Sequence, residues 1–180
     1  ARYTTIGPAD SLLKITPTVK AQLNTLLNQQ KQQPAKYNAL RLVLTGADSN
    51  KINTTGHWLA AKQQQNLYQV NAAALVSKYI GETEKNLEKI FSKAQTKNWI
   101  LFFDEADTLL GKRLSSVTQG IDNEVNAMRS TLLIELEKFN GIAIFATNFA
   151  KNYDEAFSAA IESLESGKAN QCLQKLISLQ

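Results

Sequence analysis

Two adjacent acidic residues, Asp104 and Glu105, directly follow an apolar run in the stretch WILFFDEAD. Five apolar residues without alternation are typical of a strand that is buried on both faces. The acids would then lie at the carboxyl edge of a sheet, where open α/β folds bind their ligands. Carboxylates at that edge can hold magnesium through water or orient an attacking water molecule. The alternative is a strand that ends in an ordinary polar turn.

Segments with strand and helix patterns alternate along the chain and must position this pair. Apolar runs predict buried strands over residues 41–45, 67–70, 99–103 and 142–148. Apolar residues at helical spacing predict helices that start at Thr16-Pro17, near His57 and near Thr83, and a long one over residues 125–139. This alternation predicts a mostly parallel sheet with helices on both faces, which is a three-layer α/β sandwich.

Composition excludes several classes of protein. The 180 residues suit one domain, and the net charge of +4 comes from 20 basic and 16 acidic residues without a basic run. One cysteine and one histidine exclude a disulfide framework and a zinc site of His and Cys ligands. No apolar run has the length of a membrane span, and the N-terminus lacks the pattern of a signal peptide. We therefore expect a cytoplasmic protein with no membrane segment.

Four segments occur in a fixed order: a strand ending at Gly46, SKYIGETEKN, LFFDEADTLLGKR and IAIFATN. This order and wording resemble the AAA+ ATPases of the branch that remodels or unfolds proteins. The resemblance covers about residues 17–157, and the two middle motifs together are highly specific. It implies a P-loop NTPase fold, with residues 1–180 forming the large nucleotide-binding subdomain. A DEAD-box helicase shares the letters DEAD, but it would carry neither GETEKN upstream nor the ATN strand downstream.

The resemblance assigns catalytic roles at the sheet edge. Asp104 and Glu105 occupy the place of the Walker B pair, in which the aspartate holds magnesium through water. The glutamate of that pair orients the water that attacks the γ-phosphate of ATP. Asn148 occupies the sensor 1 place, between that glutamate and the γ-phosphate. The implied cofactors are therefore ATP and magnesium.

The resemblance also implies a protein partner. The family carries a pore loop, which grips an extended polypeptide in the channel of a ring, at the positions of Lys78, Tyr79 and Ile80. An aromatic side chain beside a cation can hold varied side chains by burying area, without demanding one sequence. The alternative places Tyr79 in the core. The implied partner is a protein substrate, bound by a ring of identical or different chains.

The phosphate loop departs from the family pattern. A Walker A motif needs Gly, four residues and then Gly-Lys-Ser/Thr, because glycine lets backbone amides surround the phosphates and the lysine neutralises them. Counted from Gly46, Lys51 stands at the position of the second glycine, Ile52 at the position of the lysine and Asn53 at the position of the hydroxyl residue. Losing that lysine forfeits about 4 kcal/mol at an effective dielectric of about 20. Lys51 is a poor replacement, because a one-residue slip turns a side chain by about 100° on a helix. The expected nucleotide-binding stretch is thus degenerate, and it comprises Gly46, Ala47, Asp48, Ser49, Asn50, Lys51, Ile52 and Asn53.

Two further departures concern the second half of the chain. Ala159 and Ala160 occupy the positions at which the arginine finger of a neighbouring subunit is expected. Residues 161–180, IESLESGKANQCLQKLISLQ, are interpreted as a helical tail in place of the usual lid, with no final core strand evident. Residues 1–35 are interpreted as an N-terminal segment and helix.

Three hypotheses about function follow. The first is a degenerate AAA+ domain that keeps the fold and the partner surface but has weak or absent ATP hydrolysis. The second is a working ATPase with an unconventional phosphate loop and a lid or finger supplied by another chain. The third is a nucleic-acid-binding module, which is least favoured because aromatic residues are not interleaved with basic ones.

Overall fold

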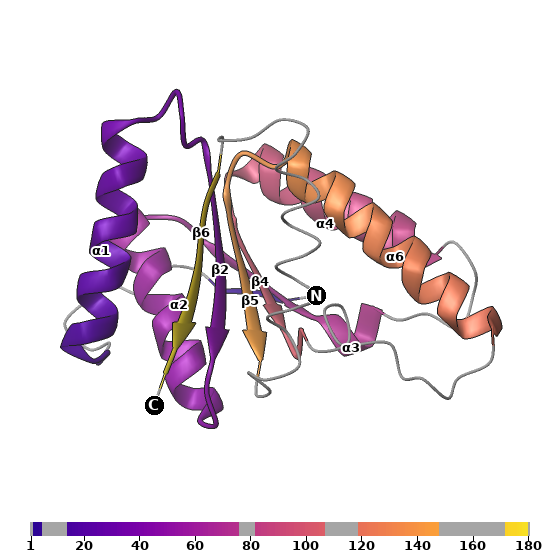
Figure 1. Cartoon of the computed structure of the whole chain (residues 1–180), viewed down its shortest axis with the longest axis horizontal. Coiled ribbons are helices and arrows are strands. Elements are labelled where there is room, and N and C mark those ends of the chain that lie inside the picture. The colour runs from indigo at the N-terminus through magenta and orange to yellow at the C-terminus, as the bar shows by residue number, and fades with distance from the viewer. Residues whose placement is uncertain (1, 5–13, 76–81, 107–118, 148–171, 180) are drawn as a thin grey trace.

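The computed structural model describes residues 2–4, 14–75, 82–106, 119–147 and 172–179. Within these residues, six strands form a single sheet in the order β1-β3-β4-β5-β2-β6 (Figure 1). Five of the strands are parallel neighbours, and β1 pairs antiparallel with β3 at one edge. The strands are β1 (Arg2–Thr4), β2 (Ala39–Thr45), β3 (Leu67–Asn71), β4 (Ile100–Asp104), β5 (Ile142–Thr147) and β6 (Cys172–Ser178).

Helices cover both faces of the sheet. In Figure 1, α1 and α2 lie on one face, and α4 and α6 lie on the other. The helices are α1 (Pro17–Gln32), α2 (Ser49–Gln63), the short α3 (Ala72–Leu75), α4 (Glu82–Lys97) and α6 (Gln119–Lys138). The sequence-based prediction of a three-layer, mostly parallel α/β sandwich is therefore confirmed.

Two apolar clusters make up the core, one on each face of the sheet. On β4, Ile100 and Phe102 pack into the cluster beneath α1 and α2, while Leu101 and Phe103 pack into the cluster beneath α4 and α6. Successive side chains of a strand point to opposite faces, so a strand covered on both sides must be apolar at every position. This requirement explains the unbroken apolar run that precedes Asp104.

Helix α2 packs directly against the sheet at a glycine, Gly56. A Cβ atom on Gly56 would lie 2.7 Å from the ring of Phe102, so no larger residue fits without a shift. Helix α1 begins where the sequence predicts, since the Thr16 hydroxyl accepts a hydrogen bond from the Val19 N–H at 3.4 Å and Pro17 occupies the first turn.

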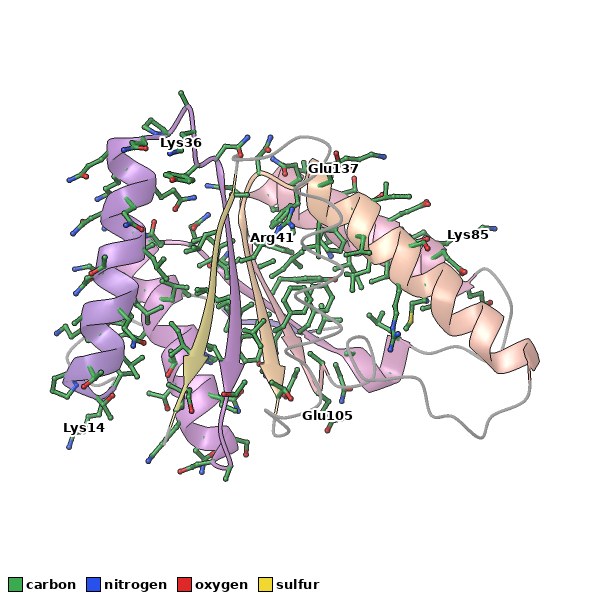
Figure 2. All side chains as sticks on the ribbon, viewed as in Figure 1. Lys14, Lys36, Arg41, Lys85, Glu105 and Glu137 are labelled. Atoms are coloured by element: carbon green, nitrogen blue, oxygen red, sulfur yellow. The ribbon has the colours of Figure 1, made fainter. Side chains whose placement is uncertain are left out.

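One buried cation lies in the cluster beneath α4 and α6. Arg41 of β2 is 8% exposed, and its Nη2 donates a hydrogen bond to the Leu136 carbonyl at 2.7 Å. That carbonyl belongs to the last turn of α6 and also accepts a hydrogen bond from the Phe139 N–H at 3.3 Å. Figure 2 shows Arg41 between the sheet and the end of α6 that carries Glu137. The arginine therefore ties the strand before the Gly46 loop to α6.

Two sequence-based expectations are wrong. The helix expected near His57 begins earlier, at Ser49, so Ser49 to Asn53 belong to α2 and not to an irregular loop. Residues 172–178, expected to be helical, form β6, which pairs in parallel with β2 over its whole length and supplies the core strand that seemed absent. Cys172 is accordingly the first residue of a strand. The part of the proposed tail over residues 161–171 lies outside the described residues.

Candidate functional site

Three strand ends meet at the carboxyl edge of the sheet. Thr45 of β2 lies opposite Thr147 of β5, and the Gly46 N–H donates a hydrogen bond to the Thr147 carbonyl at 3.3 Å. From the other side, the Ala106 N–H donates to the Ala146 carbonyl at 3.0 Å. The loop after β2 and the turn after β4 therefore both contact the end of β5, at the edge where open α/β sheets bind their ligands.

The acidic pair stands at this edge. Asp104 is the last residue of β4 and is half-buried, and its Oδ1 accepts a hydrogen bond from the Glu105 N–H at 2.9 Å. Glu105 is exposed and has a φ of 52°, in the left-handed region. A residue with a side chain pays roughly 1–2 kcal/mol for that conformation, and such strain is concentrated at functional sites. Figure 2 shows Glu105 at the arrowhead end of the sheet. The catalytic roles of the two acids stay predictions.

The remaining predicted residues of this machinery cannot be compared with the structure. Asn148 follows Thr147 directly but lies outside the described residues, as do Lys78, Tyr79 and Ile80. The positions of the expected arginine finger, Ala159 and Ala160, are also outside them.

The connection between β2 and α2 is short. Only Gly46, Ala47 and Asp48 separate the two elements, so the helix begins within the stretch where a Walker A loop would curl around phosphate. Asp48 is the N-cap, and its carboxylate accepts a hydrogen bond from the Asn50 N–H at 2.9 Å. A helix N-terminus attracts anions through its free amides and its dipole. Here the chain's own carboxylate occupies that position.

Ile52, at the lysine position of the motif, faces the core. Its side chain is 3% exposed and packs in the apolar cluster beneath α1 and α2. Its N–H donates to the Asp48 carbonyl at 3.3 Å, as the first turn of a helix requires. The neighbouring Lys51 is exposed, and its carbonyl accepts a hydrogen bond from the Thr55 hydroxyl at 2.7 Å. The two side chains thus leave the helix in different directions.

Gly46 has a structural reason to be glycine. A Cβ atom there would lie 2.5 Å from the Leu179 carbonyl oxygen, and the Leu179 N–H donates to the Thr45 carbonyl at 2.6 Å. The backbone that leaves β6 therefore lies directly against the loop. Close packing explains this glycine without any nucleotide.

A cavity of about 490 Å³ lies beside the loop, between the start of α1, the first half of α2 and the end of β6. Its lining includes the cations Lys14 and Lys51 together with the hydroxyl groups of Thr16, Thr55 and Ser178. Figure 2 shows Lys14 at the start of α1. Sequence reasoning missed this cavity, because Ser178 comes from the strand that was expected to be helical.

The donor set does not fit a magnesium nucleotide in the usual pose. Asp104 offers a carboxylate at the edge, but the predicted phosphate loop has a carboxylate at the helix N-terminus and a buried isoleucine at the position predicted for the lysine. Across the described part of the chain, no three His, Cys, Asp or Glu side chains gather closely enough to hold a metal ion. None of the described helices has the length and apolar character to cross a bilayer.

His57, the single histidine of the sequence, lies on α2 close to the loop. Its Nδ1 is buried and has no hydrogen-bond partner, and burial lowers the pKa of the imidazole below its ordinary value of 6.5. Burial therefore disfavours the protonated form of this side chain. The adjacent Trp58 is 3% exposed and packs in the apolar cluster beneath α1 and α2.

Comparison with known proteins decides the family. A sequence profile described as "ATPase family associated with various cellular activities (AAA)" matches residues 53–165. The chain belongs to the AAA family of ATPases. The matched range of this AAA domain begins at Asn53, after the loop residues 46–52.

Several named proteins are similar to this AAA domain. The putative cell division cycle ATPase of Plasmodium falciparum is 32% identical over 150 residues, which are 77% of this chain and 12% of that protein. Spastin of Xenopus laevis is 29% identical over 149 residues, covering 79% of this chain and 23% of spastin. The chain therefore spans less than a quarter of either protein.

A solved structure supports the same fold. The FIGL-1 AAA domain in complex with ADP superposes with a TM-score of 0.66 and 18% sequence identity, over 98% of this chain and 58% of that one. At that identity the likeness bears on the fold alone.

Proposed function

We propose that this AAA domain serves a protein-remodelling assembly through its fold and its protein contacts, with ATP hydrolysis weak or absent. The observation that carries this proposal is the Asp48 cap. Its carboxylate holds the Asn50 N–H at the start of α2, where an ATPase of this fold would bind phosphate. A triphosphate would have to displace this carboxylate and would be repelled by it.

The apolar environment of Ile52 supports the same conclusion. A lysine at the motif position must point to the phosphates, whereas this side chain is nine-tenths or more buried in the core. The family profile matches residues 53–165, a range that begins just after the loop residues 46–52. Spastin and FIGL-1 are longer proteins, and any partner resembling theirs is part of this proposal.

Phosphate release from ATP with magnesium tests the proposal. We expect the wild-type protein to release phosphate at or only slightly above the background rate of a Glu105→Gln variant, because little or no turnover depends on Glu105. A Glu137→Gln variant is the matched control, since Glu137 is an exposed glutamate at the far end of the sheet. Sustained turnover well above background, which the Glu105 variant abolishes and the Glu137 variant keeps, would overturn the proposal.

A charge-removing variant tests the role of the cap directly. Asparagine is as good an N-cap as aspartate, so Asp48→Asn should preserve α2 while removing the negative charge. At this exposed position, repulsion between unit charges about 4 Å apart is worth about 1 kcal/mol, which is about fivefold in affinity. We expect Asp48→Asn to bind ATP about fivefold more tightly than the wild type. An unchanged affinity would show that Asp48 does not repel the nucleotide.

The cavity supports a second candidate, an ATPase whose nucleotide is held in an unconventional way. Lys14 and Lys51 line the cavity and could neutralise phosphates that the helix N-terminus does not accept. In that case a Lys51→Met variant would lose ATP binding. A Lys62→Met variant would keep ATP binding, because Lys62 is an exposed lysine in the last turn of the same helix. Equal and weak binding by all three proteins favours the first proposal.

A further inference from the structure

The turn between α6 and β5 contains the only Asn-Gly pair in the sequence, Asn140-Gly141. Neither residue belongs to a helix or strand, and Asn140 is exposed. In Figure 1 this turn lies at the end of the sheet opposite the arrowheads, far from the edge that carries Asp104. Glycine leaves its own amide nitrogen unshielded, because it has no side chain to block the approach of the preceding residue.

We propose that Asn140 is a self-modification site, at which the folded protein converts its own asparagine to aspartate and isoaspartate with water as the co-reactant. The Gly141 amide nitrogen loses its proton and attacks Asn140 Cγ, which forms a C–N bond and expels the side-chain amide as ammonia. Water then opens the cyclic imide at either carbonyl. Attack at one carbonyl leaves aspartate, and attack at the other leaves isoaspartate.

The hydrogen bonds around the pair leave the nucleophile available. No hydrogen bond involves the Gly141 N–H within the part of the chain that the structure describes. The Asn38 Nδ2 donates to the Asn140 Oδ1 at 3.0 Å, which draws electron density from Cγ and makes that carbon more electrophilic. The Gln95 Oε1 accepts from the Asn140 N–H at 3.1 Å and anchors the residue from its other side.

Asn98 provides an internal comparison. It is exposed and also ends a helix, but the residue after it is Trp99, whose bulk hinders approach to the backbone nitrogen. The Trp99 N–H also donates to the Ala94 carbonyl at 3.0 Å, so the nucleophile is already engaged. Asn98 and Asn140 are therefore both exposed, but they differ in the backbone nitrogen of the following residue, which is the nucleophile.

The modification would act on the neighbouring strands β2 and β5. The Gly141 carbonyl accepts a hydrogen bond from the Leu40 N–H at 3.1 Å, which is the first contact between β5 and β2. Isoaspartate adds a methylene to the backbone immediately before that contact and displaces the pairing. Both products also place a negative charge just after the end of α6, where the helix dipole disfavours anions.

Peptide mapping of the intact folded protein tests the proposal. After incubation in mildly alkaline buffer, we expect Asn140 to convert before any other asparagine, with enzymatic methylation of isoaspartate mapping to the same peptide. Conversion should accelerate as the pH rises, because the attacking amide must lose a proton. An Asn140→Gln variant keeps an amide but needs a larger ring, so the early ammonia release and the methylation should disappear.

Two results would overturn the proposal. One is that Asn98 or another asparagine converts first in the folded protein while Asn140 stays intact. The other is that Asn140 converts only in denaturant, because the native turn would then hold Cγ away from the Gly141 nitrogen. Should Asn140→Gln fail to fold, Asn140→Ser removes the reacting carbonyl and must equally abolish conversion at this position.

Discussion

The substitution Ile52→Lys separates two descriptions of the phosphate loop because they predict opposite results. If Ile52 is a core residue, a lysine there loses apolar packing and must either extend its ammonium group to water or become neutral. Truncation of buried isoleucine usually costs 2–5 kcal/mol, so we expect a loss of about 3 kcal/mol in the free energy of unfolding. For a domain of this size that corresponds to a fall of roughly 6–12 °C in Tm.

Urea denaturation monitored by tryptophan fluorescence measures this loss. Trp58 lies in the same apolar cluster as Ile52, and Trp99 packs against the cluster on the other face, so the signal reports both halves of the core. Ile52→Met keeps the volume and should cost less than about 1.5 kcal/mol. Lys51→Met changes the exposed neighbour and should stay within about 0.5 kcal/mol of the wild type.

The refuting result is equally specific. If Ile52→Lys is as stable as the wild type and gains saturable binding of ATP with magnesium, then residue 52 faces the phosphate position. The core placement of Ile52 and the proposal that this loop does not support ATP hydrolysis would both be wrong.

Four further predictions concern the same region. Asp48→Ala removes the N-cap of α2 and should lower the free energy of unfolding by about 1 kcal/mol in urea titrations. Gly56→Ala drives a methyl group into the ring of Phe102 and should cost roughly 1–3 kcal/mol in the same assay. Gln64 ends α2 with a φ of 53°, so Gln64→Gly should stabilise the domain, by about 1 kcal/mol, and an unchanged Tm would contradict this. Burial lowers the pKa of His57, so the unfolded chain takes up the proton first and stability should fall as the pH drops below 6.5. His57→Gln should flatten that slope in urea titrations at a series of pH values.

Much of the fold could be predicted because buried strands and amphipathic helices leave unambiguous patterns. The runs that became β2, β4 and β5 are apolar except for Arg41 and the last residue of each strand, and a nearly unbroken apolar run is what coverage on both faces requires. The start of α1 was equally clear from Thr16 and Pro17. The position of the acidic pair at the sheet edge followed from the end of β4.

The missed elements depended on contacts that a local pattern does not contain. In CLQKLIS the apolar residues fit a helix or a strand, and pairing with β2 along seven residues decides for the strand. The early start of α2 was obscured by the expectation of a phosphate loop, although Asp48 before Ser49 and Asn50 is an N-cap signal in the sequence itself. The cavity needed both of these elements in place before it could be recognised.

The backbone amides at the start of α2 offer the most direct test of whether the Asp48 carboxylate keeps phosphate away from this helix N-terminus. In an NMR titration with ATP and magnesium, we predict that the amide resonances of Asn50 and Lys51 stay in place, because the Asp48 carboxylate keeps its hydrogen bond. Saturable shifts of these resonances, accompanied by steady phosphate release, would contradict the account.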